Sequence, residues 1–189
     1  MQVIAGTARR ILLKTLPGDH TRPTSDRVKE TLFNILQPRI PGCRFLDLFA
    51  GCGGIAIEAL SRGAKEAVLV DNNRRACEII RENLAWTHLA EKALLWQTDA
   101  AAAVKRLTDR GERFDIIFLD PPYDGGWEML VLPLLAQSSL LAPEGLIVLE
   151  TRVQRELPEL EQWGLVLERE KKYKNNKHMF IRLKEKEDE

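Results

Sequence analysis

Short apolar runs alternate with amphipathic stretches between residues 44 and 151. The runs predict five strands, at residues 44–49, 66–70, 93–97, 114–119 and 146–150. Two of the intervening stretches have helical spacing, with apolar residues at Ile55, Ala56, Ala59 and Leu60 before Gly63, and at Ala76, Ile79, Ile80 and Leu84. Apolar strands that alternate with helices are typical of a parallel sheet covered on both faces, so the pattern predicts a doubly wound α/β fold.

Segments on both sides of this alternation add further elements. Residues 1–6 and 11–16 predict a strand pair, and the segment after Pro23 predicts a helix capped by Thr24 or Ser25. The expected buried face of this helix consists of Val28, Leu32, Ile35 and Leu36. Residues 165–183 predict two strands around a turn at Asn175 and Asn176, which brings the mostly parallel sheet to seven strands.

These elements divide the chain into three parts. We expect residues 1–40 to form an N-terminal hairpin and helix extension, residues 41–184 to form the main domain, and residues 185–189 to be a charged tail. If the first of the two C-terminal strands runs parallel to the core strands, its basic exit lies at their carboxyl ends. That exit contains Lys171, Lys172, Lys174 and Lys177.

The four expected core strands before residue 121 each end at an aspartate. Asp47, Asp71, Asp99 and Asp120 lie at or just beyond these ends. Ligands of doubly wound folds bind outside the carboxyl ends of the strands, so we expect the four carboxylates at one ligand-binding edge. An aspartate in such a position is often only a helix N-cap. Four of them at one edge favour a ligand, because buried charge without a partner is costly.

A glycine loop follows the first strand. Residues 51–56, GCGGIA, fit the G-x-G-x-x-G/A pattern of a dinucleotide site, and Asp71 lies 20 residues after Gly51. Gly51 and Gly53 would let a ligand approach the backbone, and Asp71 can accept hydrogen bonds from both ribose hydroxyls. Any cofactor that contains adenosine would use both features.

Asp47 decides between the candidate cofactors. A carboxylate beside the glycine loop would repel a pyrophosphate. S-adenosylmethionine has no phosphate and carries an ammonium and a sulfonium, so an acid-lined pocket suits it. We therefore expect S-adenosylmethionine, with Asp99 and Ala100 near its adenine. The other residues expected to contact it are Phe49, Gly51, Gly53, Asp71, Asn72 and Asp120.

The fourth core strand runs into Asp120, Pro121, Pro122 and Tyr123. Proline has no N–H and fixes its own φ, so this corner is stiff and presents only acceptors, the Asp120 carboxylate and the Pro121 carbonyl. Such a pair matches an NH2 group that has two protons to donate. A Pro-Pro pair alone is usually no more than a turn, but here it follows a strand beside an expected cofactor pocket.

This corner predicts methylation of an exocyclic amine on a nucleobase. Accepting both hydrogen bonds of the amine favours localising its lone pair on nitrogen, which can then attack the sulfonium methyl. Asp120, or a water that it holds, is the natural recipient of the released proton. Tyr123 offers a face on which the base can stack, worth roughly 1–3 kcal/mol.

The charge balance, the cysteines and the absence of long apolar stretches exclude some classes of protein. The 28 basic and 28 acidic side chains balance, so the net charge gives no hint of a polyanionic partner, but the first forty residues carry seven Lys or Arg against three acids. The three cysteines lack CxxC spacing, which argues against disulfides and zinc and favours a reducing cytoplasm. We expect no metal. The chain has neither an apolar stretch near the roughly 20 residues of a membrane span nor a signal-peptide pattern.

Three segments of the sequence resemble known motifs. Residues 47–54, DLFAGCGG, resemble motif I of class I S-adenosylmethionine-dependent methyltransferases, and residues 120–123, DPPY, resemble the catalytic motif of their amino-methylating branch. The segments VIAGTARR, at residues 3–10, and TRPTSDRVKETLFNIL, at residues 21–36, resemble the RsmD family. That family methylates the N2 amine of one guanine in bacterial 16S rRNA. The resemblance extends over nearly the whole chain.

The resemblance implies roles for particular residues. Asp71 would bind the ribose, and Asp120, Pro121 and Tyr123 would form the catalytic corner that holds the guanine. Asn72 and Asn73 depart from the usual residues after the ribose acid. The expected RNA-contacting residues are Arg22, Thr24, Arg27, Lys171 and Lys174, besides Tyr123.

The expected partner is therefore 16S rRNA or the assembling small subunit, bound by a cytoplasmic monomer. The target amine must be flipped out or unpaired to reach the corner. Three other classes of protein stay open. A DNA adenine-N6 methylase usually needs an added recognition region, and a protein-glutamine methylase usually has Asn in place of Asp120. A nucleic-acid-binding protein without activity would not need the corner.

Overall fold

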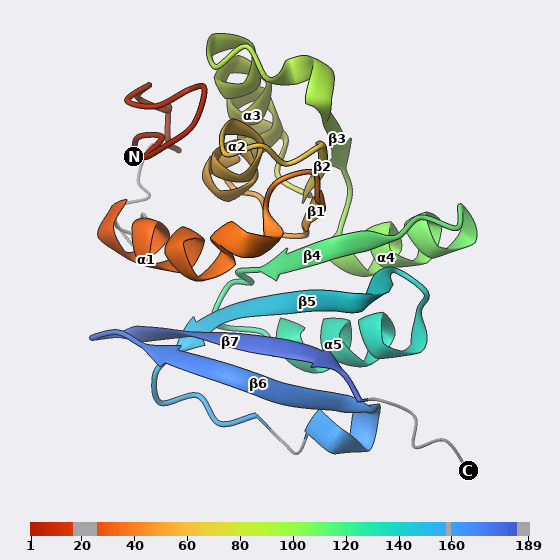
Figure 1. Ribbon diagram of the computed structural model, residues 1–189. Coiled ribbons are helices and arrows are strands. Elements are labelled where there is room, and N and C mark those ends of the chain that lie inside the picture. Colours follow the sequence, from red (N-terminus) through yellow and green to blue (C-terminus); the bar gives the residue numbers. More distant parts are fainter. Residues whose placement is uncertain (17–25, 158–159, 185–189) are drawn as a thin grey trace.

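The computed structural model describes residues 1–16, 26–157 and 160–184. Within them the strands form a seven-stranded sheet of order β3-β2-β1-β4-β5-β7-β6 (Figure 1). The strands are β1 (Arg44–Asp47), β2 (Glu66–Asp71), β3 (Ala93–Gln97), β4 (Phe114–Leu119), β5 (Leu141–Arg152), β6 (Leu165–Lys172) and β7 (Asn176–Leu183). The strands β1 to β5 pair in parallel and β7 pairs antiparallel to both β5 and β6, so β6 runs in the direction of the core strands. The predicted fold class is confirmed.

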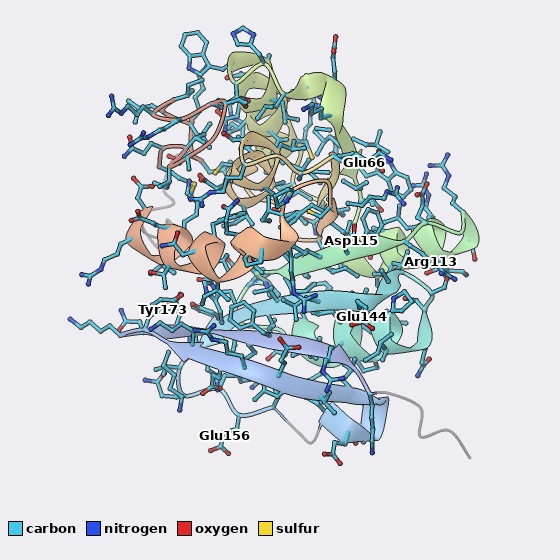
Figure 2. The ribbon with its side chains drawn as sticks, in the orientation of Figure 1. Glu66, Arg113, Asp115, Glu144, Glu156 and Tyr173 are labelled. Carbon is cyan, nitrogen blue, oxygen red and sulfur yellow. The ribbon has the colours of Figure 1, made fainter. Side chains whose placement is uncertain are left out.

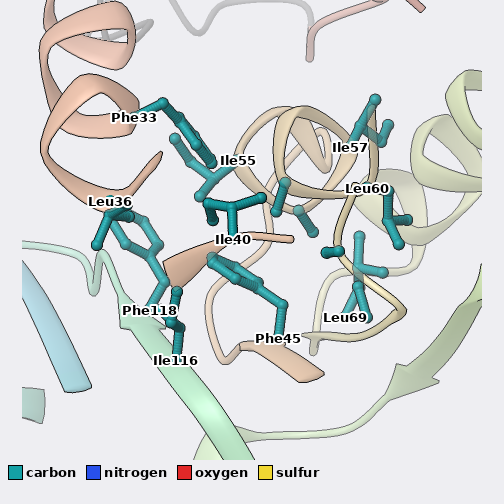
Figure 3. Close-up of a cluster of buried hydrophobic side chains, with 14 of the residues drawn as sticks. Phe33, Leu36, Ile40, Phe45, Ile55, Ile57, Leu60, Leu69, Ile116 and Phe118 are labelled. Atoms are coloured by element: carbon teal, nitrogen blue, oxygen red, sulfur yellow. The ribbon is translucent and has the colours of Figure 1, made fainter. Parts of the chain in front are cut away.

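Five α-helices cover the two faces of the sheet in the described part of the chain. They are α1 (Asp26–Leu36), α2 (Gly54–Ser61), α3 (Arg74–Trp86), α4 (Ala100–Asp109) and α5 (Trp127–Gln137). The short 3-10 helices are η1 (Gln37–Arg39), η2 (Ala90–Lys92) and η3 (Leu160–Trp163). The helices α1, α2 and α3 pack into one apolar cluster, and α4 and α5 pack into another on the opposite face. Figure 3 shows the first cluster, in which Phe33 of α1 and Ile55 of α2 lie near Phe118 of β4.

The boundaries of the elements agree with the sequence pattern to different degrees. The strands β3 and β4 have the predicted bounds, whereas β1 ends at Asp47 and β5 begins at Leu141 and ends at Arg152. The pattern did not predict α4 or α5. The C-terminal turn lies one position earlier than predicted, because Asn176 already belongs to β7.

The N-terminal segment forms only a short part of the predicted strand pair. A single bridge joins Gln2 to Leu12. The N–H groups of Ile4 and Ala5 donate instead to the Glu58 carboxylate of α2, at 2.8 and 3.1 Å. Gly6, at a φ of +84°, packs against α2 so closely that a Cβ there would lie 1.8 Å from the Ser61 carbonyl oxygen. Backbone hydrogen bonds join Val3 to Arg10 and Ile11, and Met1 to Leu13, so the pairing is confined to residues 1–3 and 10–13 and docking onto α2 replaces its continuation.

The buried face of α1 also differs from the prediction. Lys29 and Phe33 are fully buried together with Leu32 and Leu36, whereas Val28 and Ile35 are only half-buried. The Lys29 ammonium lies 3.3 Å from the buried Glu58 carboxylate and donates to the carbonyl of Gln2. This buried ion pair joins α1, α2 and the N-terminal segment. The predicted cap residues Thr24 and Ser25 lie outside the described residues.

The strand order reverses between β1 and β4. From β1 the chain moves outward to β2 and β3, and it then returns to the other side of β1 as β4. In open α/β sheets such a reversal leaves a crevice at the carboxyl ends of the two strands. No helix in the part of the chain described here is long and apolar enough to cross a membrane.

Candidate active site

A cavity of about 800 Å³ lies at this crevice, outside the carboxyl ends of the strands. Its wall contains all four of the predicted aspartates, Asp47, Asp71, Asp99 and Asp120. The other predicted residues in the wall are Phe49, Gly51, Asn72, Ala100, Pro121 and Tyr123. The sheet therefore brings the glycine loop and the proline-rich corner to one cavity, although about 70 residues separate them in the chain.

Two glycines in the loop between β1 and α2 have backbone conformations in the left-handed region. Gly51 has a φ of +57°, and a Cβ there would meet nothing within 4 Å, so any side chain would enter the cavity. Its N–H donates to Asp71 Oδ2 at 2.8 Å. Gly53, at a φ of +82°, begins α2 and faces the core, where a Cβ would lie 3.3 Å from Leu69. Gly53 thus shapes the loop but does not line the cavity.

Asp47 lies at the end of β1 and is only 1% exposed. Burial raises its pKa to about 7, and repulsion from the Asp71 carboxylate acts in the same direction, while N–H groups of Phe49 and Ala56 oppose the shift. Its Oδ1 has no hydrogen-bond partner within the described residues. A buried acceptor in a cavity wall suits a positively charged ligand and disfavours a phosphate.

Asp71 and Asp99 are held by backbone N–H groups. Asp71 Oδ1 accepts from the N–H of Asn73 at 2.8 Å, while its other oxygen accepts from Gly51. Asp99 is the N-cap of α4 and accepts from the N–H of Ala102 at 2.9 Å. The helix-cap interpretation therefore holds for Asp99, whereas Asn73 caps α3 and Gly53 precedes α2. A carboxylate has about four lone-pair sites, so both residues keep acceptor capacity toward the cavity.

The Asp-Pro-Pro-Tyr corner follows β4 and faces the cavity. Asp120 and Tyr123 are half-buried, Pro121 is buried, and Pro122 is exposed. All four residues line the cavity together with Trp127, whose ring meets the Phe49 ring edge to face at 6.2 Å. The corner therefore offers its acceptors to the same space that the glycine loop borders.

Of the predicted RNA-contacting residues that the structure describes, Arg27, Lys171 and Lys174 do not line this cavity. Arg27 is exposed on the first turn of α1, Lys171 is half-buried in β6, and Lys174 is exposed in the β6–β7 turn. Arg22 and Thr24 lie in the segment that the structure does not describe. Because β6 runs parallel to the core strands, its basic end does lie at the edge where the cavity opens.

The β6–β7 turn is anchored by a buried polar network. His178 and Glu150 are both fully buried, and His178 Nε2 lies 3.0 Å from Glu150 Oε2. Tyr173, labelled at this end of the sheet in Figure 2, places its hydroxyl 3.1 Å from His178 Nδ1. Asn176 donates to Glu150 at 2.7 Å. Strand β5 therefore fixes the position of the turn.

Several residues of the cavity wall were not predicted. They are Met1, Thr15, Leu16, Leu48, Ala50, Cys52, Gly54, Ile55, Asn73, Ala76, Thr98, Phe118, Pro122 and Trp127. Cys52 and Trp127 adjoin predicted motifs, so their position in the chain was a usable signal. The N-terminal segment carries no local signal for this role, because its contact with the cavity depends on docking to α2. No group of three or more His, Cys, Asp and Glu side chains suited to a metal ion occurs among the described residues.

Comparison with known proteins places this arrangement among methyltransferases of ribosomal RNA. A family model described as "Conserved hypothetical protein 95" matches residues 1–182. The Ribosomal RNA small subunit methyltransferase D of Escherichia coli K12 is 37% identical over 166 residues, which cover 87% of this chain and 82% of that protein. Its namesake from Haemophilus influenzae is 33% identical over 169 residues, which cover 89% of this chain and 88% of that protein.

Solved structures show the same fold. The Escherichia coli protein yhhF has a TM-score of 0.83 and 32% identity, and the match covers 98% of this chain and 99% of that chain. A hypothetical protein from Thermus thermophilus has a TM-score of 0.82 and 31% identity, with 95% of this chain and 98% of that chain covered.

Proposed function

Because the chain belongs to the RsmD family, we propose that it transfers a methyl group from S-adenosylmethionine to the exocyclic N2 amine of a guanine in 16S rRNA. The observation that carries this proposal is that the acceptor-only corner at Asp120 and the loop at Gly51 line one cavity. Such a cavity can hold a methyl donor and an amine next to each other.

The residues of the glycine-loop half of the cavity fit S-adenosylmethionine. The unpartnered Oδ1 of Asp47 suits a cationic ligand, and the open space at Gly51 leaves room for one. Asp71 would accept hydrogen bonds from the ribose, and Asp99 and Ala100 would lie at the adenine. When bound, S-adenosylmethionine supplies a methyl group made electrophilic by its sulfonium sulfur.

The corner acts on the target base. Asp120 and the carbonyl of Pro121 accept the two hydrogen bonds of the guanine amine, which favours localising the nitrogen lone pair. Asp120 also takes up the proton that the nitrogen loses, directly or through a water. Tyr123 stacks on the base, and this contact fixes the amine in position for reaction.

The basic residues outside the cavity contact RNA phosphates. Lys171 at the end of β6, Lys174 in the turn that follows and Arg27 on the first turn of α1 would make such contacts. Arg22 and Thr24, which lie outside the described residues, are assigned the same role from the resemblance of their segment to the RsmD family. Such contacts orient the RNA without reading its sequence. We infer that the protein works in the cytoplasm as a monomer and selects its target by the shape of 16S rRNA or of the assembling subunit.

Incubation with labelled S-adenosylmethionine tests the proposal. The substrates are 16S rRNA, small subunits that lack the modification, double-stranded DNA, and protein from the same cells. We expect label in 16S rRNA or small subunits, recovered as N2-methylguanosine after digestion. Label only in DNA adenine would favour the DNA methylase, and label only in protein would favour the glutamine methylase; either result contradicts the proposal.

An Asp120→Ala variant tests the role of the corner. Loss of a proton acceptor costs typically 10²–10⁴ in rate, so turnover should fall by about that factor. Binding of S-adenosylmethionine, measured by calorimetry, should remain within about threefold of the unmodified protein. Asp109→Ala, which removes an exposed carboxylate at the end of α4, is the matched control and should change neither quantity. Near-normal turnover of Asp120→Ala would remove Asp120 from the mechanism.

A further inference from the structure

Arg152, the last residue of β5, lies over the ring of Tyr123. Its guanidinium carbon is 4.6 Å from the ring centroid, which is a cation–π contact. A second, smaller hollow shares Pro121, Pro122 and Tyr123 with the large cavity, and Arg152 lines it. Arg152 is not among the residues that line the large cavity, so the guanidinium covers the Tyr123 ring from the side of the smaller hollow.

Arg152 is held only weakly in this position. Asp124 Oδ1 lies 3.9 Å from Arg152, beyond hydrogen-bond distance, and the Asp124 side chain is 98% exposed. An exposed pair of this kind contributes little stability. Arg155 differs, because its Nε donates to the buried carboxylate of Glu128 at 2.6 Å. Arg155 is therefore fixed, whereas the half-exposed Arg152 side chain can be displaced.

A base that stacks on this face of Tyr123 has to displace the guanidinium. Contacting planes lie roughly 3.5 Å apart, so a base between the ring and the guanidinium would need about 7 Å. The separation in the structure is 4.6 Å. The five N–H donors of Arg152 would then lie at the mouth of a site whose inner end offers only acceptors.

Guanine matches this arrangement of donors and acceptors. With its N2 amine at Asp120 and Pro121, its O6 and N7 acceptors lie side by side on the Hoogsteen edge, to which the amine does not belong. Arginine binds O6 and N7 of guanine in a bidentate manner, and adenine lacks O6. We propose that Arg152 is the residue that selects guanine: it covers Tyr123 until the base enters, and it then donates hydrogen bonds to O6 and N7. This inference rests on the proposed function.

The test compares guanine with 2-aminopurine at the methylated position of 16S rRNA, once that position has been mapped. 2-Aminopurine keeps the N2 amine but lacks O6. The unmodified protein should have a kcat/KM about tenfold lower on 2-aminopurine. In Arg152→Ala the value for guanine should fall by a similar factor and the two bases should become equal within about twofold. Combining the loss of the Arg152 side chain with the loss of O6 forms a double-mutant cycle, and the non-additivity of the two effects on kcat/KM measures their interaction.

Two further variants complete the experiment. Arg152→Lys keeps the charge without the planar fork and should lose the discrimination as Arg152→Ala does. Arg113→Ala removes an exposed arginine at the amino end of β4, far from Tyr173 in Figure 2, and should behave as the unmodified protein. The fluorescence of 2-aminopurine, which falls on stacking, should still fall with Arg152→Ala, because Tyr123 remains.

Two results would overturn the inference. If Arg152→Ala lowers kcat/KM equally for both bases, Arg152 contacts the RNA without reading the base. If the unmodified protein does not distinguish the bases, the O6 edge is not recognised. Failure of the proposed function is seen separately, as absence of label from guanine in the first experiment, and it would overturn both.

Discussion

Asp47 is the residue whose chemistry is most changed by the fold. Its carboxyl is buried at the end of β1, and its pKa rises from 3.8 to about 7 because burial disfavours the charged form. At pH values between these two limits, the folded protein holds a proton that the unfolded chain has released. The free energy of unfolding therefore includes a contribution from Asp47 that is complete below pH 4 and is lost as the pH rises through about 7.

An Asp47→Asn variant should lack this contribution. Between pH 5 and pH 8 the unmodified protein should lose on the order of a few kcal/mol more of its free energy of unfolding than the variant does. Urea denaturation of both proteins at the two pH values measures the difference. Equal pH dependence in the two proteins would show that Asp47 titrates normally.

Substitution of the two loop glycines should affect different properties, cofactor binding for Gly51 and stability for Gly53. Gly51→Ala places a methyl group in the cavity, so we expect weaker binding of S-adenosylmethionine with a loss of stability of only about 1–2 kcal/mol from the positive φ. Gly53→Ala adds contacts of 3.3–3.4 Å to Leu69, Ile57 and Ile80, so its loss of stability should be larger. Calorimetric titration and thermal unfolding of both variants separate the two effects. A larger stability loss for Gly51→Ala would contradict the assignment.

At the scale of elements, the β6–β7 turn depends on a residue of β5. Glu150 accepts from Asn176 and lies 3.0 Å from His178, and both of these partners belong to β7. Because Glu150 is fully buried, each lost partner leaves a costly acceptor. The position of Lys174 in the turn, and of Lys171 at the end of β6 beside it, therefore depends on this network.

Substitution of His178 should loosen the turn without affecting the cofactor half of the cavity. We expect His178→Phe to lower the free energy of unfolding by about 1–3 kcal/mol. Hydrogen exchange should increase at residues 173–177, and affinity for S-adenosylmethionine should stay unchanged. Tyr173→Phe, which removes one hydroxyl, should cost only about 0.5–1.5 kcal/mol. A change in exchange confined to α3 would refute this account of the turn.

The sequence pattern predicted elements whose cause is local and missed those whose cause is distant. The strands β3 and β4 have the predicted bounds because their apolar runs begin and end sharply. The mostly apolar sequence of α5, with Pro133 inside the helix, shows no such periodicity. Burial of Lys29 could not be predicted because it depends on Glu58, 29 residues later in the chain.

The same distinction applies to the candidate site. Its aspartates were predictable because parallel strands must end at one edge, so a local motif was enough to place each of them. Arg152 was not predictable, because a charged residue at a strand end is common and its contact with Tyr123 arises only when β4 and β5 pair. The docking of the N-terminal segment is likewise a tertiary effect, since Glu58 and Ser61 accept from the N–H groups of residues 4, 5 and 8, beyond the short paired stretch.

At the scale of the whole molecule, the net charge is zero, so attraction of RNA would depend on particular basic residues. If Lys171 and Lys174 contact phosphates, binding of 16S rRNA should weaken as salt rises, with a slope of the logarithmic plot of about −0.7 per contact for single-stranded RNA. The double variant Lys171→Gln, Lys174→Gln should reduce that slope by about 1–2 and weaken binding to all RNA sequences alike. Titration at several salt concentrations measures the change.

The matched control for this experiment is Lys65→Gln together with Lys105→Gln. Both lysines are exposed, Lys65 just before β2 and Lys105 on α4. Their removal changes the net charge equally but should leave the slope unaltered. An equal reduction in both double variants would mean that overall charge, rather than the β6–β7 turn, governs attraction.

Because the strand order reverses between β1 and β4, the two sides of the cavity are built by successive halves of the chain. In the proposed function, everything up to Ala100 that borders the cavity belongs to the methyl-donor side, and the acceptor side begins with β4. A chimera joined within α4 could therefore exchange one half for that of a relative while the other stays intact. In evolution, substitutions in the second half could likewise change the target while the residues that bind the methyl donor stay the same.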